Sequence, residues 1–248
     1  MSYIIDINTT CAICGTKSEQ QLVASSFQYD LPDLDTRPGE MSRSTMHLWI
    51  EKCPHCGYIS TDLSKEPLLS KEVVRSIIES DEYKNCLNVG FPSKAAKDFY
   101  RCAYIQKETL EKLPRIQRFF KKRKISKDCF WRLMWCAWEC DDYGEEYSEL
   151  AKKVRLLSIP YLRNSFSKWQ DEEEYDSNLL VLVDLYRRTD QFDSVVKYLT
   201  DEKLSIISKF KRSMHRKIAQ FQLEKAKEKD NSRYSLEDIG IEDEDDEE

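Results

Sequence analysis

The chain has 248 residues, of which 40% are hydrophobic and 11% aromatic. This length and composition allow one large or two small domains with a buried core, and they exclude a chain that is unfolded throughout. The start, MSYIIDINTT, has no basic segment, and nowhere do about 18 consecutive apolar residues occur, so we expect neither an export signal nor a membrane span. We therefore expect a cytoplasmic protein without a membrane partner.

Charge and cysteines are unevenly distributed along the chain. The formal net charge is -6, but nine acidic residues and no basic one lie in Glu237–Glu248, so the rest of the chain is mildly basic. The cysteine count is nine, an odd number. Because a reducing compartment disfavours structural disulfides, we expect paired cysteines to bind a metal and the others to be free thiols.

Residues 3–62 show the pattern of short strands and turns. YIIDI leads into a first cysteine pair, Cys11 and Cys14, and MHLWIEK leads into a second pair, Cys53 and Cys56. Each lead-in is a short β-prone run that ends at a C-x2-C turn. Proline and glycine mark further turns in the 38 residues between the pairs.

The two pairs together supply four thiolates, which is the full ligand set of a tetrahedral zinc site. Each pair is followed by a glycine, Gly15 or Gly57, suited to the left-handed backbone of such a turn. A redox C-x-x-C motif is the weaker alternative, because neither pair opens a helix in a βαβ pattern. Four cysteines leave no position for water, so we predict a structural rather than a catalytic ion. The predicted zinc ligands are Cys11, Cys14, Cys53 and Cys56.

Two histidines lie close to these cysteines in the sequence. His55 lies inside the second pair, where we expect its ring to point away from an ion already bound by its neighbours. His47 is an alternative ligand. His215 stands alone among basic residues of a predicted helix.

A charged motif, DLDTR, lies in the segment between the pairs. Asp33 and Asp35 are two residues apart in a predicted extended segment, so their carboxylates should face the same way, with Arg37 and Arg43 nearby. Acid–base catalysis needs partnered groups in a pocket, and this motif alone shows neither a pocket nor a nucleophile. We expect the aspartates to organise the loop by accepting backbone hydrogen bonds. A recognition site formed by Asp33, Asp35 and Arg37 is the alternative.

From about Ser64 onward the apolar residues take helical spacing and glycine becomes rare. Short loops should make neighbouring helices antiparallel. Ser70, Ser93 and Ser126 are predicted N-caps. The predicted helices cover residues 70–87, 93–113, 126–141, 145–165, 172–188, 192–199 and 204–229.

The predicted helices 172–188 and 192–199 form a hairpin similar to a tetratricopeptide repeat, although the diagnostic small residues are largely missing. Its apolar positions are Leu182, Leu185, Tyr186, Phe192, Val195, Val196 and Leu199.

The segment CFWRLMWCAWEC is apolar nearly all round, which favours a helix in the middle of a bundle over an aromatic ligand-binding or base-stacking surface. Cys136 and Cys140 are one turn apart and Cys129 precedes them by a heptad, so a second thiolate cluster is geometrically conceivable. Free cysteine is among the most buried residue types, and we expect these three, like Cys86 and Cys102, to pack in the core.

A strongly basic segment, RIQRFFKKRKISK, precedes this helix. It is either a solvated loop between helices, which we favour, or a surface that neutralises phosphates and stacks bases on Phe119 and Phe120. No phosphate-binding Gly-rich loop, G-x-S-x-G or H-E-x-x-H motif occurs in the sequence, so we expect binding rather than catalysis. The basic residues are Arg115, Arg118, Lys121, Lys122, Arg123, Lys124 and Lys127.

The stretches CAICG and PDLDTRPGEMSRSTMHLWIEKCPHCGY resemble an uncharacterised family of prokaryotic proteins, described as a domain of unknown function. Members carry paired C-x-x-C motifs, often followed by tetratricopeptide-like helices. The resemblance implies zinc binding by the four paired cysteines and implies no known activity. Ala12 departs from the family pattern, in which such turns usually have proline, and zinc ligation should survive this change.

Taken together, the sequence predicts an α+β, mainly α fold. Residues 1–64 should form a zinc-ribbon-like domain, residues 65–229 antiparallel helical hairpins, and residues 230–248 a disordered acidic tail. The expected function is that of a non-catalytic adaptor with a structural zinc ion and a protein partner. Nucleic-acid binding through residues 115–127 and the ribbon is the alternative.

Overall fold

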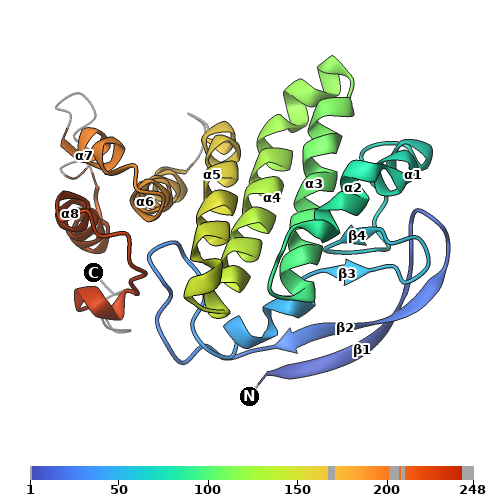
Figure 1. Ribbon diagram of the computed structural model, residues 1–248, viewed down its shortest axis with the longest axis horizontal. Coiled ribbons are helices and arrows are strands. Elements are labelled where there is room, and N and C mark those ends of the chain that lie inside the picture. The colour runs from blue at the N-terminus through green and yellow to red at the C-terminus, as the bar shows by residue number, and fades with distance from the viewer. Residues whose placement is uncertain (1, 167–170, 201–206, 208–209, 242–248) are drawn as a thin grey trace. The chain divides into compact units, whose positions relative to one another are not determined.

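The computed structural model describes residues 2–166, 171–200, 207 and 210–241 (Figure 1). They fall into two compact units: the first combines Met1–Phe27 with Ser44–Ser165, and the second combines Gln28–Arg43 with Phe166–Glu248. The expected division into a ribbon domain and a helical domain stays a prediction. None of the helices in these ranges is long and apolar enough to cross a membrane.

Two small antiparallel hairpins open the first unit. Strand β1 (Tyr3–Thr10) pairs with β2 (Lys17–Ser25), and β3 (Glu51–Lys52) pairs with β4 (Ile59–Ser60). The side chain of Gln20 joins the hairpins, because its amide accepts from the Lys52 N–H and donates to the Lys52 carbonyl, both at 3.3 Å. Each hairpin places one cysteine pair at its turn, as predicted.

Five α-helices complete this unit, and two of the predicted N-caps are confirmed. The hydroxyl of Ser70 accepts from the Val73 N–H, and that of Ser93 accepts from the Ala96 N–H. One predicted helix, 70–87, is instead broken at Ser80, whose extended backbone ends α1 and whose hydroxyl caps α2. The helices are α1 (Lys71–Glu79), α2 (Asp81–Asn85), α3 (Lys94–Lys112), α4 (Arg115–Asp142) and α5 (Ser148–Ser165). Short 3-10 turns cover Arg43–Leu48, Cys86–Asn88 and Glu145–Tyr147.

The predicted start of α4 at Ser126 is wrong. The helix begins at Arg115, directly after Pro114, and Ser126 is buried in its interior. Lysine and arginine are good helix formers, so the basic segment continues the helix instead of forming the expected loop. Arg118 fastens this start, because its guanidinium donates to the carbonyls of Glu111 and, at 3.0 Å, Leu113 at the end of α3.

Helix α4 lies between α3 and α5 (Figure 1). The stripe of Phe130, Met134 and Ala137 is fully buried, and Trp138 is buried beside it. Trp135 is half-buried, and its ring meets the ring of Phe99 edge-on at 5.5 Å. The prediction of a central helix with an aromatic core is therefore confirmed.

The second unit contains α6 (Glu172–Arg188), α7 (Phe192–Thr200) and α8 (Ser213–Lys227). Helices α6 and α7 form the predicted hairpin, and the rings of Tyr186 and Tyr198 stack across it at 5.5 Å. The last predicted helix, 204–229, is wrong at residues 210–212, which are not helical, because α8 begins only at Ser213; Leu204 itself lies outside the described residues.

The acidic tail was expected to be disordered from residue 230, and this is wrong for residues 230–241. The Leu34 N–H donates to the Tyr234 carbonyl at 2.9 Å, and the Leu236 N–H donates to the Pro32 carbonyl at 3.0 Å. A 3-10 turn, Glu237–Ile239, follows, and Ile241 is buried. Backbone pairing with the loop 28–43 holds this segment; the acidic run 242–248 lies outside the described residues.

The fully buried guanidinium of Arg187 connects α6 to the segment after α8. It pairs with Asp184 at 2.6 Å and donates to the carbonyls of Asp230 and Ser232 at 3.1 and 2.6 Å. Its guanidinium also lies over the ring of Tyr234, 5.3 Å from the centroid. One guanidinium therefore pairs with a carboxylate on α6 and donates hydrogen bonds to two carbonyls in the segment after α8.

We predict that Arg187→Ala lowers the free energy of unfolding by about 3–5 kcal/mol, because it leaves the Asp184 carboxylate buried without its partner. Urea unfolding followed by circular dichroism measures the loss. The control, Lys227→Ala at an exposed position of α8, should change stability by no more than about 0.5 kcal/mol. Equal losses in the two variants would contradict a structural role for Arg187.

Candidate metal centre

The two cysteine pairs lie on two turns with the same backbone geometry. In the first, the Gly15 N–H donates to the Cys11 carbonyl at 2.8 Å; in the second, the Gly57 N–H donates to the Cys53 carbonyl at 3.0 Å. Both glycines have φ near +75°, at 75° and 74°. A side chain would strain this left-handed backbone, so the glycine after each pair lets the turn close.

The four sulfur atoms of the pairs converge on one point. All lie within 4.8 Å of one another. The Sγ atoms of Cys11 and Cys56 are 3.8 Å apart, and those of Cys14 and Cys53 are 3.6 Å apart. A regular tetrahedron with Zn–S bonds of about 2.3 Å has edges of about 3.8 Å. The cluster therefore fits a tetrahedral ion such as zinc.

The thiols differ in their protonation when no metal is bound. Burial raises the pKa of Cys11 and of Cys56. For Cys14, burial acts in the same upward direction, but hydrogen bonds from Thr16 and contacts with Cys53 and His55 outweigh it and lower the pKa to about 5. A divalent cation would replace the remaining protons, because thiolates rather than thiols bind zinc.

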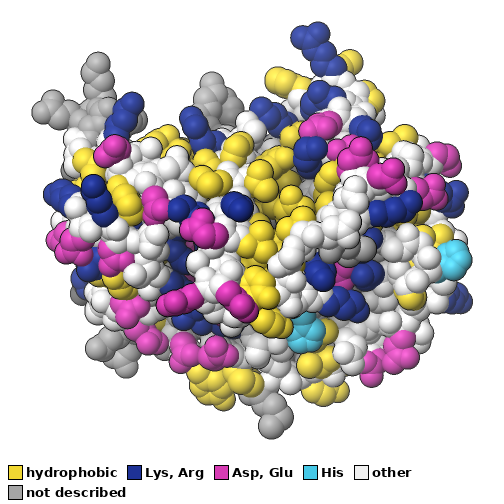
Figure 2. Space-filling view, viewed as in Figure 1, with side chains coloured by type: hydrophobic (Ala, Val, Ile, Leu, Met, Phe, Trp, Pro, Cys, Tyr) yellow, Lys and Arg dark blue, Asp and Glu magenta, His cyan; other side chains and the backbone are white. Residues whose placement is uncertain are grey.

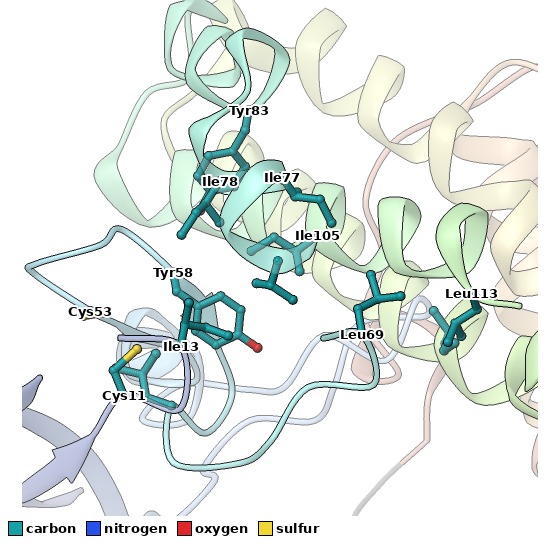
Figure 3. Packing of buried hydrophobic residues seen from close by; sticks show 13 residues of the cluster. Cys11, Ile13, Cys53, Tyr58, Leu69, Ile77, Ile78, Tyr83, Ile105 and Leu113 are labelled. Atoms are coloured by element: carbon teal, nitrogen blue, oxygen red, sulfur yellow. The ribbon is translucent and has the colours of Figure 1, made fainter. Parts of the chain in front are cut away.

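The two turns are part of the helical core (Figure 3). Cys11, Ile13 and Cys53 belong to one buried apolar cluster with residues of α1, α2 and α3, including Ile77, Tyr83 and Ile105. Polar contacts reinforce this packing.

Three polar contacts fasten the two cysteine turns, two of them to the helices and one to the chain after β4. The Tyr83 hydroxyl donates to the Gly57 carbonyl at 2.8 Å, and the Arg75 guanidinium donates to the Ile13 carbonyl at 2.7 Å. The Ala12 N–H donates to the Leu63 carbonyl at 2.8 Å, which ties the first turn to the segment between β4 and α1. A metal ion held here would thus also hold the segment between β4 and α1, which leads into the helices.

The other cysteines and the histidines lie outside this cluster. Cys86, Cys102, Cys129, Cys136 and Cys140 are buried, as predicted for core thiols. His47 and His55 are exposed side chains on the first unit. His215 is buried in the second unit, 3.9 Å from Asp176, and burial lowers its pKa.

The charged motif between the cysteine pairs forms a buried turn. Asp33, Asp35 and Arg37 are 6%, 2% and 0% exposed. The Asp33 N–H donates to the Arg37 carbonyl at 2.9 Å, and the Asp35 carboxylate accepts from the Arg37 N–H at 3.3 Å. A Cβ at Gly39 would lie 2.0 Å from the Asp30 carbonyl oxygen, so the turn closes only with glycine there. The expected hydrogen bond from a backbone N–H to a carboxylate is present at Asp35, whereas the Asp33 carboxylate faces arginine side chains. A partner could reach these side chains only if the loop moved.

Asp33 is the electrostatic centre of this turn. Its carboxylate pairs with Arg43 at 3.1 Å and lies 3.8 Å from the Nε of Arg233. Burial and the neighbouring charge of Asp35 nevertheless raise the pKa of Asp33 to about 6.

The predicted basic surface lies on the first two to three turns of α4. Arg115, Lys121, Lys122 and Lys124 are exposed. Arg118 caps the end of α3, and Arg123 donates to the Ser165 carbonyl at 2.9 Å.

The sequence analysis identified Phe119 and Phe120 but missed Ile116, which lies beside them on the helix. The spacing i, i+3, i+4 of these three side chains could have revealed it.

We predict that the chain, purified without added metal, contains about one zinc ion and that Cys11→Ser reduces this content to well below half. The physical reason is loss of one of four thiolate ligands. Inductively coupled plasma mass spectrometry measures the content. The matched control is Cys86→Ser, a buried cysteine outside the cluster, which should retain the metal. A folded, metal-free wild-type chain would contradict the zinc assignment.

We predict that Asp33 makes stability depend on pH. Because its folded pKa, about 6, lies above the unfolded value, its contribution is complete below about pH 4 and is lost as pH rises through 6. Between pH 4 and 7 the wild type should therefore lose up to about 3 kcal/mol relative to Asp33→Asn. Urea unfolding at several pH values measures this, with the exposed Asp193→Asn as control. Parallel pH profiles for wild type and Asp33→Asn would contradict the assignment.

Comparison of the chain with protein-family models, with curated proteins and with solved structures gave no match. The family resemblance based on the cysteine motifs is therefore not confirmed. What the structure supports is a cluster of four cysteines on small β-hairpins, followed by a helical region.

Proposed function

We propose that the chain is a non-catalytic adaptor in which a structural zinc ion fixes the β-hairpins and a helical surface binds a protein partner. The zinc assignment is supported by the sulfur geometry: four thiolates at tetrahedral spacing fill the coordination shell and leave no position for a reacting water. In this proposal the α6–α7 hairpin is a tetratricopeptide-like element of the scaffold.

The observation that carries the adaptor function is an exposed apolar surface at the start of α4. Ile116, Phe119 and Phe120 are 75%, 80% and 74% exposed. Single exposed apolar residues are common on protein surfaces, but three large adjacent ones mark an interaction site. Figure 2 shows hydrophobic and basic side chains together at this projecting end, at the upper right of the view.

Nucleic-acid binding is the second candidate. It is favoured by the exposed cations Arg115, Lys121, Lys122 and Lys124, which lie near two exposed aromatic rings. Lysine and arginine neutralise phosphates, and phenylalanine stacks on bases. The rings of Phe119 and Phe120 meet edge to face, with centroids 5.4 Å apart. This geometry offers no pair of parallel faces for successive bases, so we place the protein partner first.

We predict that the tagged chain, purified from its native cells at near-physiological salt, retains a stoichiometric protein after nuclease treatment. Quantitative mass spectrometry identifies it. Substitution of Phe119 and Phe120 by alanine should remove it, whereas the control Tyr143→Ala, an exposed aromatic residue at the other end of α4, should not. Recovery of nucleic acid, with all proteins lost on digestion, would contradict the adaptor function and support the second candidate.

A further inference from the structure

The exposed apolar side chains belong to the face of α4 that packs against α5. Three contacts define this face: Asp141 pairs with Arg155 at 3.1 Å, the Ser158 hydroxyl contacts the Met134 sulfur at 3.7 Å, and Arg123 donates to the Ser165 carbonyl. On an α-helix, residues 7 or 11 apart share a face, and 141, 134 and 123 follow these intervals. Ile116 lies seven residues before Arg123, and Phe119 and Phe120 lie four and three residues before it.

Helix α5 ends at Ser165, the residue that Arg123 contacts. Residues 115–122 of α4 therefore extend about two turns beyond the end of their packing partner. Over these two turns the helix-packing face continues with Ile116, Phe119 and Phe120, which are all exposed. The packing face of α4 therefore contacts α5 along one part of its length and is open over residues 115–122.

Charge surrounds this open face. With 100° per residue, Lys124 lies along one edge of the apolar stripe, and Arg115 and Lys122 lie along its other edge. Arg118 and Lys121 lie on the face of the helix opposite the stripe. The whole stretch 115–127 contains no acidic residue. An occupant must therefore supply apolar side chains in a row, with acidic residues beside them.

We propose that an acidic amphipathic helix of a protein partner docks on Ile116, Phe119 and Phe120, in line with α5. This inference rests on the adaptor function and specifies its partner. The partner helix carries apolar residues at i, i+3, i+4 and i+7, flanked by glutamate or aspartate that pair with Arg115, Lys122 and Lys124. It packs on the first two turns of α4 in the way that α5 packs on the following turns.

Other occupants fit the same surface less well. A flat membrane cannot lie along this face, because α5 extends about 10 Å outward from the same side of α4. A second copy would bring two strongly basic helix ends together. The chain's own acidic run, residues 242–248, supplies charge but contains no apolar residue. An acidic amphipathic helix of a separate protein supplies both the negative charge and the apolar side chains.

The test uses the full zinc-loaded chain and a synthetic peptide of about 20 residues, long enough to form a helix on binding. The peptide has leucine at the a and d heptad positions and glutamate beside them; its control is a scrambled isomer without an apolar stripe. Fluorescence anisotropy should show at least about tenfold weaker binding of the scrambled peptide. The double variant F119A and F120A should weaken binding of the amphipathic peptide by about tenfold, and Tyr143→Ala should leave it unchanged.

A salt series and two further probes make the test decisive. Lys122→Ala with Lys124→Ala should reduce affinity about threefold and flatten its salt dependence. Equal binding of both peptides, or no effect of the phenylalanine substitutions, overturns the proposal. So does tighter, Phe119-dependent binding of anionic phospholipid vesicles or of single-stranded RNA, which would assign the face to a membrane or to a nucleic acid.

The partner-capture experiment separates this proposal from the adaptor function. If the F119A and F120A chain still retains the native partner, the adaptor function stands and the docking face lies elsewhere. If the wild-type chain retains no protein, the adaptor function itself fails.

Discussion

The convergence of four sulfur atoms is the constraint on which the rest of the first unit depends. Strands β3 and β4 have two residues each, and an isolated two-stranded hairpin of any length is marginal in water. The two cysteine turns, which are separated by 38 residues in sequence, bring this hairpin to β1 and β2. A structural zinc site contributes apparent folding free energy of about 10–16 kcal/mol in small peptides. A contribution even part of that size would offset the cost of closing the long loop, which grows only slowly with its length.

The same constraint reaches the helices through shared packing. Because Cys11 and Cys53 belong to the apolar cluster that includes Ile77, Tyr83 and Ile105, a metal ion held by these cysteines would order the helical core together with the hairpins. The loop between the turns has a different role. Asp33 and Gly39 organise a buried turn in the second unit, where the loop pairs with Tyr234 and Leu236. The insertion between the two cysteine turns thus contributes to a second core.

The sequence was informative wherever local chemistry decides the structure. C-x2-C-G predicts its turn because spacing and glycine act within five residues, and Ser70 and Ser93 predict helix starts because a cap is a local hydrogen bond. It failed where a distant contact decides. Ser126 looks like a cap, but Arg118 and Pro114 start α4 earlier, and tertiary burial makes Ser126 a core residue. The acidic composition after residue 230 predicts disorder, because its pairing with Pro32 and Leu34, about 200 residues earlier, leaves no local pattern.

Helix α4 combines core and surface roles along one stripe, and this follows from its length. With 28 residues it is longer than α5, which has 18, and its first two turns extend past the end of α5. A projecting end without a role would be expected to carry polar residues on every side, because exposed phenylalanine favours aggregation and adds nothing to the fold. Here the apolar face continues unchanged past the end of α5, while every polar position carries a cation or glutamine. In the proposed docking, the cations would repel a second copy of this basic end, and the apolar stripe would keep the geometry of helix packing. In this docking, the two features together would select a helical partner of opposite charge, and neither feature alone would do so.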